Sequence, residues 1–254
     1  MTLRPDRRMV AAAVLVCWGA GIVALGLRRH DVPDADLLAR GALKLEPATY
    51  FYTVFQDGQQ IGAASSTIDT TAHGFIARDI VRARTPIGGY NQSVTAMSTA
   101  YLTHGFALDS FALSVSGTQH PLRLRGTPEP QSGVLLPTLA PIALILMREP
   151  RIGASTDRWV YDPVARRVER VTMRIAAESL FRVVDSAAFD TTRHQWMAAH
   201  VDTVRSWKIT TPSRAISAWV DSQGRIVSAS EAGGLALTRT TYEIATLNPK
   251  LDTH

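Results

Sequence analysis

Residues that could do chemistry are few and widely spaced in this 254-residue chain. His194 and His200 are six positions apart, which puts them on different faces of a helix but on one face of a strand. They could hold a metal ion, but they match no H-E-x-x-H pattern, and exposed histidines are the simpler interpretation. Asp57 and Asp221 could form a carboxylate pair. Both lie at predicted turns, where aspartate usually bonds its own backbone.

Motifs for nucleophilic catalysis and nucleotide binding are absent from the sequence. It contains no G-x-S-x-G, no P-loop and no G-x-G-x-x-G. The single cysteine, Cys17, lies in an apolar segment, which excludes an internal disulfide and any metal site built on cysteine pairs. We therefore predict that the protein is not an enzyme, and that it has no catalytic, cofactor-binding or metal-binding residues.

Apolar side chains are the stronger candidates for function. The run at 134–147 is the most apolar outside the N-terminal region, and Pro137 and Pro141 argue against a long helix or a central strand. We predict a short helix ending near residue 147, which could be core, lid or ligand contact. The candidate lid or ligand-binding residues are Leu135, Leu136, Leu139, Ile142, Leu144, Ile145 and Met147. Candidate interface residues are Trp159, Trp196 and Trp207, because tryptophan is enriched at binding hot spots.

The chain is basic, with a net charge of +5 and a sequence pI of about 9.7. This charge suits anionic lipid headgroups or an acidic partner surface. Arginines at alternating strand positions, such as Arg78, Arg82 and Arg84, indicate a solvated face. Nucleic acid is not a predicted partner, because clustered basic residues interleaved with aromatic residues are missing.

Residues 9–27 carry no charge and are flanked by arginines on both sides. At about 1.5 Å per residue, a helix of this length crosses a hydrocarbon core of about 30 Å. We predict a retained membrane anchor. A cleaved signal peptide ending near residues 24–26 and a soluble core helix are the alternatives. The charge bias favours a cytoplasmic N-terminus. The predicted anchor residues are Met9, Val14, Leu15, Trp18, Ile22, Leu25 and Leu27.

The remaining chain reads as a mainly β domain. Strands alternate with turn signals such as Asp57-Gly58, which favours a type I′ hairpin turn. We predict an anchor at 1–29, a linker at 30–47, a β-domain at 48–246 and a tail at 247–254. Within the domain, 168–185 and 235–245 are predicted strands, and 194–211 is ambiguous between helix and strand. Residues 55–65 and 219–230 share an aromatic residue, an aspartate, a turn glycine and an isoleucine, a faint repeat or two hairpins with the same turn chemistry.

Two stretches resemble a group of bacterial envelope domains of unknown function related to the LolA/LolB lipoprotein carriers. The stretches are YFYTVFQDGQQIGAASST at 50–67 and AISAWVDSQGRIVSASEAGGLALTRT at 215–240. The resemblance covers about residues 48–246. It implies a curved antiparallel half-barrel with one or two short helices and an apolar cavity, and it implies no catalytic residues.

Two functions follow as hypotheses. The first is a non-catalytic accessory subunit in the bacterial inner membrane, with its C-terminal domain in the periplasm. It would stabilise an export, respiratory or photosynthetic complex by contacting its subunits. The alternative is a periplasmic protein of lipoprotein-carrier type that binds lipid or another apolar ligand. Neither hypothesis requires a cofactor.

Overall fold

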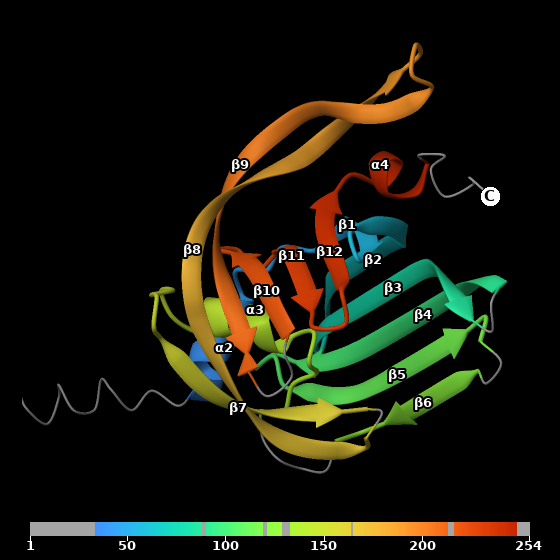
Figure 1. Cartoon of the computed structure of the whole chain (residues 1–254). Coiled ribbons are helices and arrows are strands. Elements are labelled where there is room, and N and C mark those ends of the chain that lie inside the picture. Colours follow the sequence, from blue (N-terminus) through green and yellow to red (C-terminus); the bar gives the residue numbers. More distant parts are fainter. Residues whose placement is uncertain are drawn as a thin grey trace, which may run out of the picture.

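One antiparallel sheet of twelve strands dominates the computed structural model, which describes residues 34–87, 90–118, 121–128, 133–163, 165–212 and 216–247. Three short helices accompany the sheet in these residues (Figure 1). The strand order is β6-β5-β4-β3-β2-β1-β12-β11-β10-β9-β8-β7. Two meanders of six strands therefore meet where β1 pairs with β12. The predicted mainly β architecture is confirmed at this level.

The elements follow the predicted pattern closely in the first half of the chain. Its strands are β1 (Ala48–Gln56), β2 (Gln59–Thr71), β3 (Gly74–Ile87), β4 (Tyr90–Thr103), β5 (Leu108–Ser116) and β6 (Leu122–Gly126). The second half contains β7 (Ser155–Asp162), β8 (Arg167–Asp190), β9 (Gln195–Thr211), β10 (Ile216–Asp221), β11 (Ile226–Glu231) and β12 (Leu235–Thr240). The helices are α2 (Asp34–Ala42), α3 (Ala140–Met147) and α4 (Tyr242–Thr246).

The first hairpin has the predicted turn. Asp57 and Gly58 adopt φ values of 52° and 81°. A type I′ turn needs positive φ at both central residues, which aspartate tolerates and glycine favours. The local sequence therefore determines how β1 turns into β2.

A short segment brings the two ends of the sheet together. The carbonyl of Val134 accepts a hydrogen bond from the backbone N–H of Leu108 on β5, at 2.8 Å. Leu135 forms a parallel bridge with Val160 on β7, through bonds of 2.9 and 2.8 Å to Trp159 and Tyr161. Because β6 and β7 are the edge strands, this segment ties the ends of an otherwise open sheet.

Helix α3 lies in the core. All eight of its residues are buried, and none of its faces is polar. Pro141 fits the first turn, where its missing N–H leaves no hydrogen bond unmade. Burying each Leu or Ile side chain contributes about 1.5–3 kcal/mol, so α3 is a main source of the stability of the fold.

Residues 34–47 belong to the packed domain, whereas we predicted a linker over 30–47. Leu38, Ala42 and Leu45 join the core cluster around α3. Gly41 permits the close approach of α2 and α3, because a Cβ at this position would clash with the backbone carbonyl of Leu146. The short helical pattern was visible in the sequence, but the contact with α3 was not.

The second half resolves one ambiguity and departs from prediction at two places. Of the ambiguous stretch 194–211, residues 195–211 form a strand, and β8 continues five residues beyond the predicted end at 185. The predicted strand at 235–245 stops at Thr240. There Thr241 caps α4, its hydroxyl accepting a hydrogen bond from the backbone N–H of Ile244. Hydroxyl capping of a helix competes with strand continuation at this position.

The predicted anchor residues, from Met9 to Leu27, lie outside the described residues. Within the described ranges, the structure has no helix that is both long and apolar enough to cross a membrane.

Candidate functional site

The candidate lid residues are all buried. Their exposed fractions do not exceed 8%, and all seven belong to the core cluster formed with α2 and the sheet. The interior of the domain beside the sheet is therefore occupied by α3 and the segment before it. The role of these residues as ligand contacts stays a prediction.

A pocket of about 420 Å³ lies at the C-terminal end of α3. Leu144, Met147 and Ile175 provide its apolar wall, and Arg148, Glu149 and Arg151 are among its polar lining residues. Glu149 pairs with Arg151 at 3.4 Å, with both side chains mostly exposed. The mixed polar lining makes this pocket ill-suited to a lipid chain.

The three candidate interface tryptophans occupy different environments. Trp207 is buried in the core, where its indole N–H donates to Glu178 Oε2 at 3.2 Å. Trp159 on β7 is 44% exposed. Trp196 is half-buried at the start of β9. The structure therefore leaves Trp159 and Trp196 at the surface and places Trp207 inside.

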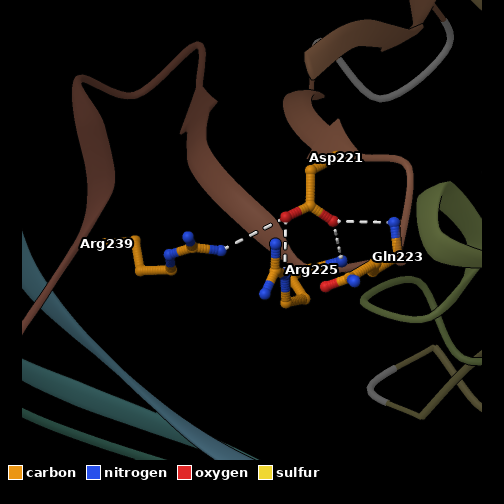
Figure 2. Close-up of polar contacts among 4 residues, drawn as sticks. All are labelled: Asp221, Gln223, Arg225 and Arg239. Carbon is orange, nitrogen blue, oxygen red and sulfur yellow. Dashed lines mark hydrogen bonds and ion pairs between the residues drawn. The ribbon is translucent and has the colours of Figure 1, made fainter. Parts of the chain in front are cut away.

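Asp221 is a buried carboxylate with two arginine partners (Figure 2). Its Oδ1 accepts backbone N–H bonds from Gln223 and Arg225 at 3.0 and 2.9 Å. Its Oδ2 accepts from Arg225 Nε at 2.6 Å and from Arg239 Nη1 at 3.5 Å. The predicted turn role of Asp221 is confirmed, and the two arginines add an ion-pair network that spans β10, β11 and β12.

A second pocket of about 420 Å³ adjoins this network. Its wall includes Tyr50, Arg225 and Arg239 from the sheet, and Val184 and Asp185 from β8. Burial raises the pKa of the Tyr50 phenol, and Arg225 partly offsets the rise. The Arg239 guanidinium lies 5.8 Å from the centre of the Tyr50 ring. These groups can bind a small polar ligand, but they include no nucleophile paired with a base.

The strand that overhangs this pocket belongs to a long ribbon of β8 and β9. β7 pairs with β8 only at Arg167–Arg174, and β10 pairs with β9 only at Ser206–Thr211. Beyond these points β8 and β9 pair with each other and bend over the neighbouring strands (Figure 1). We call residues 176–205 the arm.

The near part of the arm packs against the sheet. Val183 and Val204 are buried with Val227 of β11, and the Phe181 ring lies 4.8 Å from the Trp219 ring. At its base, Glu178 accepts a hydrogen bond from Arg205 Nε at 2.6 Å. That bond, together with the Arg205 charge and the Trp207 N–H, lowers the pKa of Glu178. These contacts fix the orientation of the arm relative to the sheet.

The far part of the arm, residues 186–200, is the distal arm. Register shifts around Ser186 mark where it begins. Here Ala187 pairs with Ala198, Ala188 with Met197 and Phe189 with Trp196. The Phe189 and Trp196 rings meet edge to face at 5.5 Å, and Phe189 is 48% exposed. The distal arm is thus an apolar hairpin that projects past α4, away from the sheet (Figure 1).

Both edges of the distal arm lack a neighbouring strand within the described chain. A two-stranded hairpin is only marginally stable in water. Exposed apolar strand edges are also sites where other chains pair. The distal arm therefore has the geometry of a docking element.

The two histidines of the sequence prediction both lie in the distal arm. His194 is in the tip turn, with φ of 50°. His200 Nδ1 lies 2.8 Å from both carboxylate oxygens of Asp185, at an exposed position. The described residues contain no cluster of three or more His, Cys, Asp or Glu side chains placed to hold a metal ion.

Comparisons with known proteins give one similar solved structure and no family. No family model and no curated protein matches the chain. A β-barrel-like protein of domain of unknown function DUF1849 from Brucella abortus has 12% identity and a TM-score of 0.48, covering 77% of this chain and 96% of its own. Its description names neither LolA nor LolB, so the predicted relation to those carriers stays a prediction.

Sequence reasoning missed the distal arm and the arginine partners of Asp221. The stretch SAAFDTTRHQWMAA has apolar residues on both sides of a polar turn, which is a hairpin signal. That signal was hidden because 194–211 also fits a helix. The pairing of Asp221 with Arg239 joins residues 18 positions apart and depends on the order of β10, β11 and β12.

Proposed function

We propose that this chain is a non-catalytic accessory protein that docks through its distal arm onto another protein chain. The N-terminal segment would hold it at the bacterial inner membrane, with the β-domain on the periplasmic side, next to a larger membrane protein complex. One observation carries this proposal. The distal arm carries exposed apolar side chains, neither of its edges pairs with another strand of the described chain, and it projects from a domain whose core is filled.

The arm has the properties of a prepared binding element. Its near part is fixed by Val183, Val204 and Phe181 against the sheet, so little ordering cost remains on binding. Its far part offers aromatic side chains, which often dominate binding energy, and strand edges with which no other strand of the described chain pairs. A partner chain can add a strand to either edge.

The accessory role is better supported than the alternative of a half-barrel lipoprotein-type carrier. A carrier needs an empty apolar cavity, whereas the described core is packed with the side chains of α3 and of the sheet. The two pockets of about 420 Å³ both have mixed polar and apolar linings. Native mass spectrometry of the full chain tests which of the two roles is better supported. A stoichiometric bound lipid would favour the carrier over the accessory role.

Position-specific photo-crosslinking in native membranes tests the docking role. A photoreactive residue replaces Ala188 in the distal arm, and Ser222 in an exposed turn serves as the matched control position. We expect one discrete adduct with another protein from position 188 and none from position 222. Mass spectrometry identifies the partner.

The variant Phe189→Asp completes the test. A charge next to Trp196 should abolish the adduct, while Arg182→Asp, a charge change on the near arm, should leave it intact. Circular dichroism of both variants checks that the sheet persists. Identical adducts from both positions, or an adduct that survives Phe189→Asp, would contradict the proposal.

A further inference from the structure

A basic surface lies far from the arm, on the side of β3–β6 turned away from the core. Antiparallel partners share a face, so the register places Arg78, Thr99, Ala112 and Arg125 in one cross-strand row. The next row contains Met97 and Arg123, and Arg82 follows along β3. The arginine face consists of Arg78, Arg82, Arg84, Arg123 and Arg125, all exposed.

The size of the arginine face follows from strand geometry. Arg78 and Arg82 are four residues apart on β3, which corresponds to about 13 Å along the strand. Arg78 and Arg125 are three strands apart, which corresponds to about 14 Å across the sheet. Met97 and Tyr101 lie between these strands and are 47% and 46% exposed. The charged groups therefore form a broad array. All of them are arginines, and none is a lysine.

Most of the positive charge of this face has no acidic partner in the part of the chain that the structure describes. Among the described residues, Arg78, Arg82, Arg123 and Arg125 form no ion pair. Two carboxylates, Asp69 on the adjoining strand β2 and Asp109 on β5, lie toward one end of these strands, and each has another partner. Asp69 accepts from the backbone N–H of Thr70, and Asp109 accepts from the Ser110 hydroxyl.

We propose that the arginine face docks on the surface of a bilayer that contains anionic phospholipids. Guanidinium groups bind phosphate oxygens in a bidentate manner, and an anionic leaflet attracts such groups by about 1 kcal/mol for each residue near its surface. Met97 and Tyr101 supply amphipathic contacts at headgroup depth. This face acts independently of the distal arm, so either proposal can fail without the other.

The composition of the face favours lipid over an acidic protein or nucleic acid. Specific protein interfaces centre on desolvated apolar clusters, whereas here charges extend from Arg78 to Arg125 around two small apolar pairs, Met97 opposite Ile80 and Tyr101 opposite Ile76. Nucleic-acid readers insert an element into a groove or stack bases on aromatic side chains. A bilayer accepts a distributed array without a fixed register, because its phosphates are mobile.

Headgroup quenching in vesicles tests this proposal on the full chain. Cys17 is the single cysteine, so a Cys17→Ser, Met97→Cys protein carries one fluorophore in the middle of the face. Vesicles contain phosphatidylcholine alone or mixed with phosphatidylglycerol, and both include a lipid with a quencher on its headgroup. We expect quenching with phosphatidylglycerol, little with phosphatidylcholine, and loss at high salt.

Charge removal makes the test specific. In the Arg78→Gln, Arg82→Gln, Arg125→Gln variant, the ratio of docked to undocked protein should fall about fivefold for each arginine removed. The matched control removes three exposed arginines elsewhere: Arg40→Gln, Arg174→Gln, Arg182→Gln. It should leave quenching unchanged. Single Arg82→Gln provides a milder variant if the triple variant does not fold.

Three results would overturn the lipid assignment. The first is equal quenching in both vesicle types. The second is equal loss in the control and face variants. The third is displacement of the face from vesicles by soluble polyglutamate at matched charge, which would reassign the face to an acidic protein.

Discussion

The β1–β2 and β10–β11 hairpins share a sequence pattern but differ in what surrounds their turns. In the first, Asp57 is exposed, and a Cβ added to Gly58 would meet nothing within 4 Å. In the second, Asp221 is 1% exposed. A Cβ on Gly224 would lie 3.0 Å from Ile142 of α3. One turn is scaffold at the surface, and the other is a junction between the sheet and the central helix.

This difference shows that the same type of turn can contribute differently to stability at two places in the fold. Both turns place glycine at positive φ, at 81° for Gly58 and 77° for Gly224. Only the second turn is close to Arg239 and to α3, because the meander brings β12 and the core helix to it. A turn motif thus predicts chain reversal but does not predict burial or ion pairing.

The largest effect should come from Asp221→Asn. The amide keeps a backbone acceptor but leaves Arg225 and Arg239 without their carboxylate in a partly buried site. Removing one partner of a buried ion pair costs about 3–5 kcal/mol of unfolding free energy. Urea denaturation followed by tryptophan fluorescence measures this loss. A loss below that of a surface substitution would show that the network adds no stability.

Glycine substitutions separate backbone strain from packing. Gly58→Ala should cost about 1–2 kcal/mol, because alanine resists positive φ. Gly224→Ala carries the same strain and also crowds Ile142 and Leu146, and such overpacking adds about 1–3 kcal/mol. Denaturation gives the loss of unfolding free energy for each variant. The difference between the two losses is the packing contribution at Gly224. Equal costs would contradict the close contact between this turn and α3.

Asp79 is a buried carboxylate whose hydrogen-bond partners are serines, in contrast to the arginine partners of Asp221. Its oxygens accept hydrogen bonds from Ser66 and Ser98 at 2.6 and 3.1 Å, and burial raises its pKa. Because the folded-state pKa is raised, its ionisation destabilises the fold. Its favourable contribution is complete below the ordinary aspartate range and is lost as pH rises through the raised pKa.

Asp79→Asn should therefore stabilise the protein at neutral pH, by an amount on the order of 1 kcal/mol. The difference from the unmodified protein should vanish at acid pH. Denaturation midpoints measured across this pH range provide the check. A destabilising effect at neutral pH would show that the serine bonds outweigh the burial of the charge.

The smallest effect should come from Asp57→Asn. Asparagine tolerates the φ of 52° as well as aspartate does, and the side chain is exposed. The unfolding free energy should change by less than about 0.5 kcal/mol. The difference in unfolding free energy loss between this variant and Asp221→Asn measures how much more the second turn contributes to stability. A large loss here would mean that the 3.3 Å contact between the Asp57 carboxylate and Gln56 stabilises the exposed turn.

Sequence reasoning predicted much of the fold and little of the candidate site. The alternating positions of Arg78, Arg82 and Arg84 and the turn at Asp57-Gly58 are local signals, and both agree with the observed strand and hairpin. The distal arm was missed because its alanine-rich strands fit two periodicities. The arginine face was read as a solvated surface, since its two-dimensional array exists only once β3, β4, β5 and β6 lie in register.

Local sequence patterns suffice to predict a mainly β chain with one short helix that has a proline in its first turn, because strand alternation and turn conformation depend on neighbouring residues. The pairing of β1 with β12, the burial of α3 in the core and the contact between Asp221 and Arg239 become visible only in the folded chain. These outcomes depend on contacts between residues far apart in the chain. No local pattern specifies which of the many antiparallel partners a strand will take.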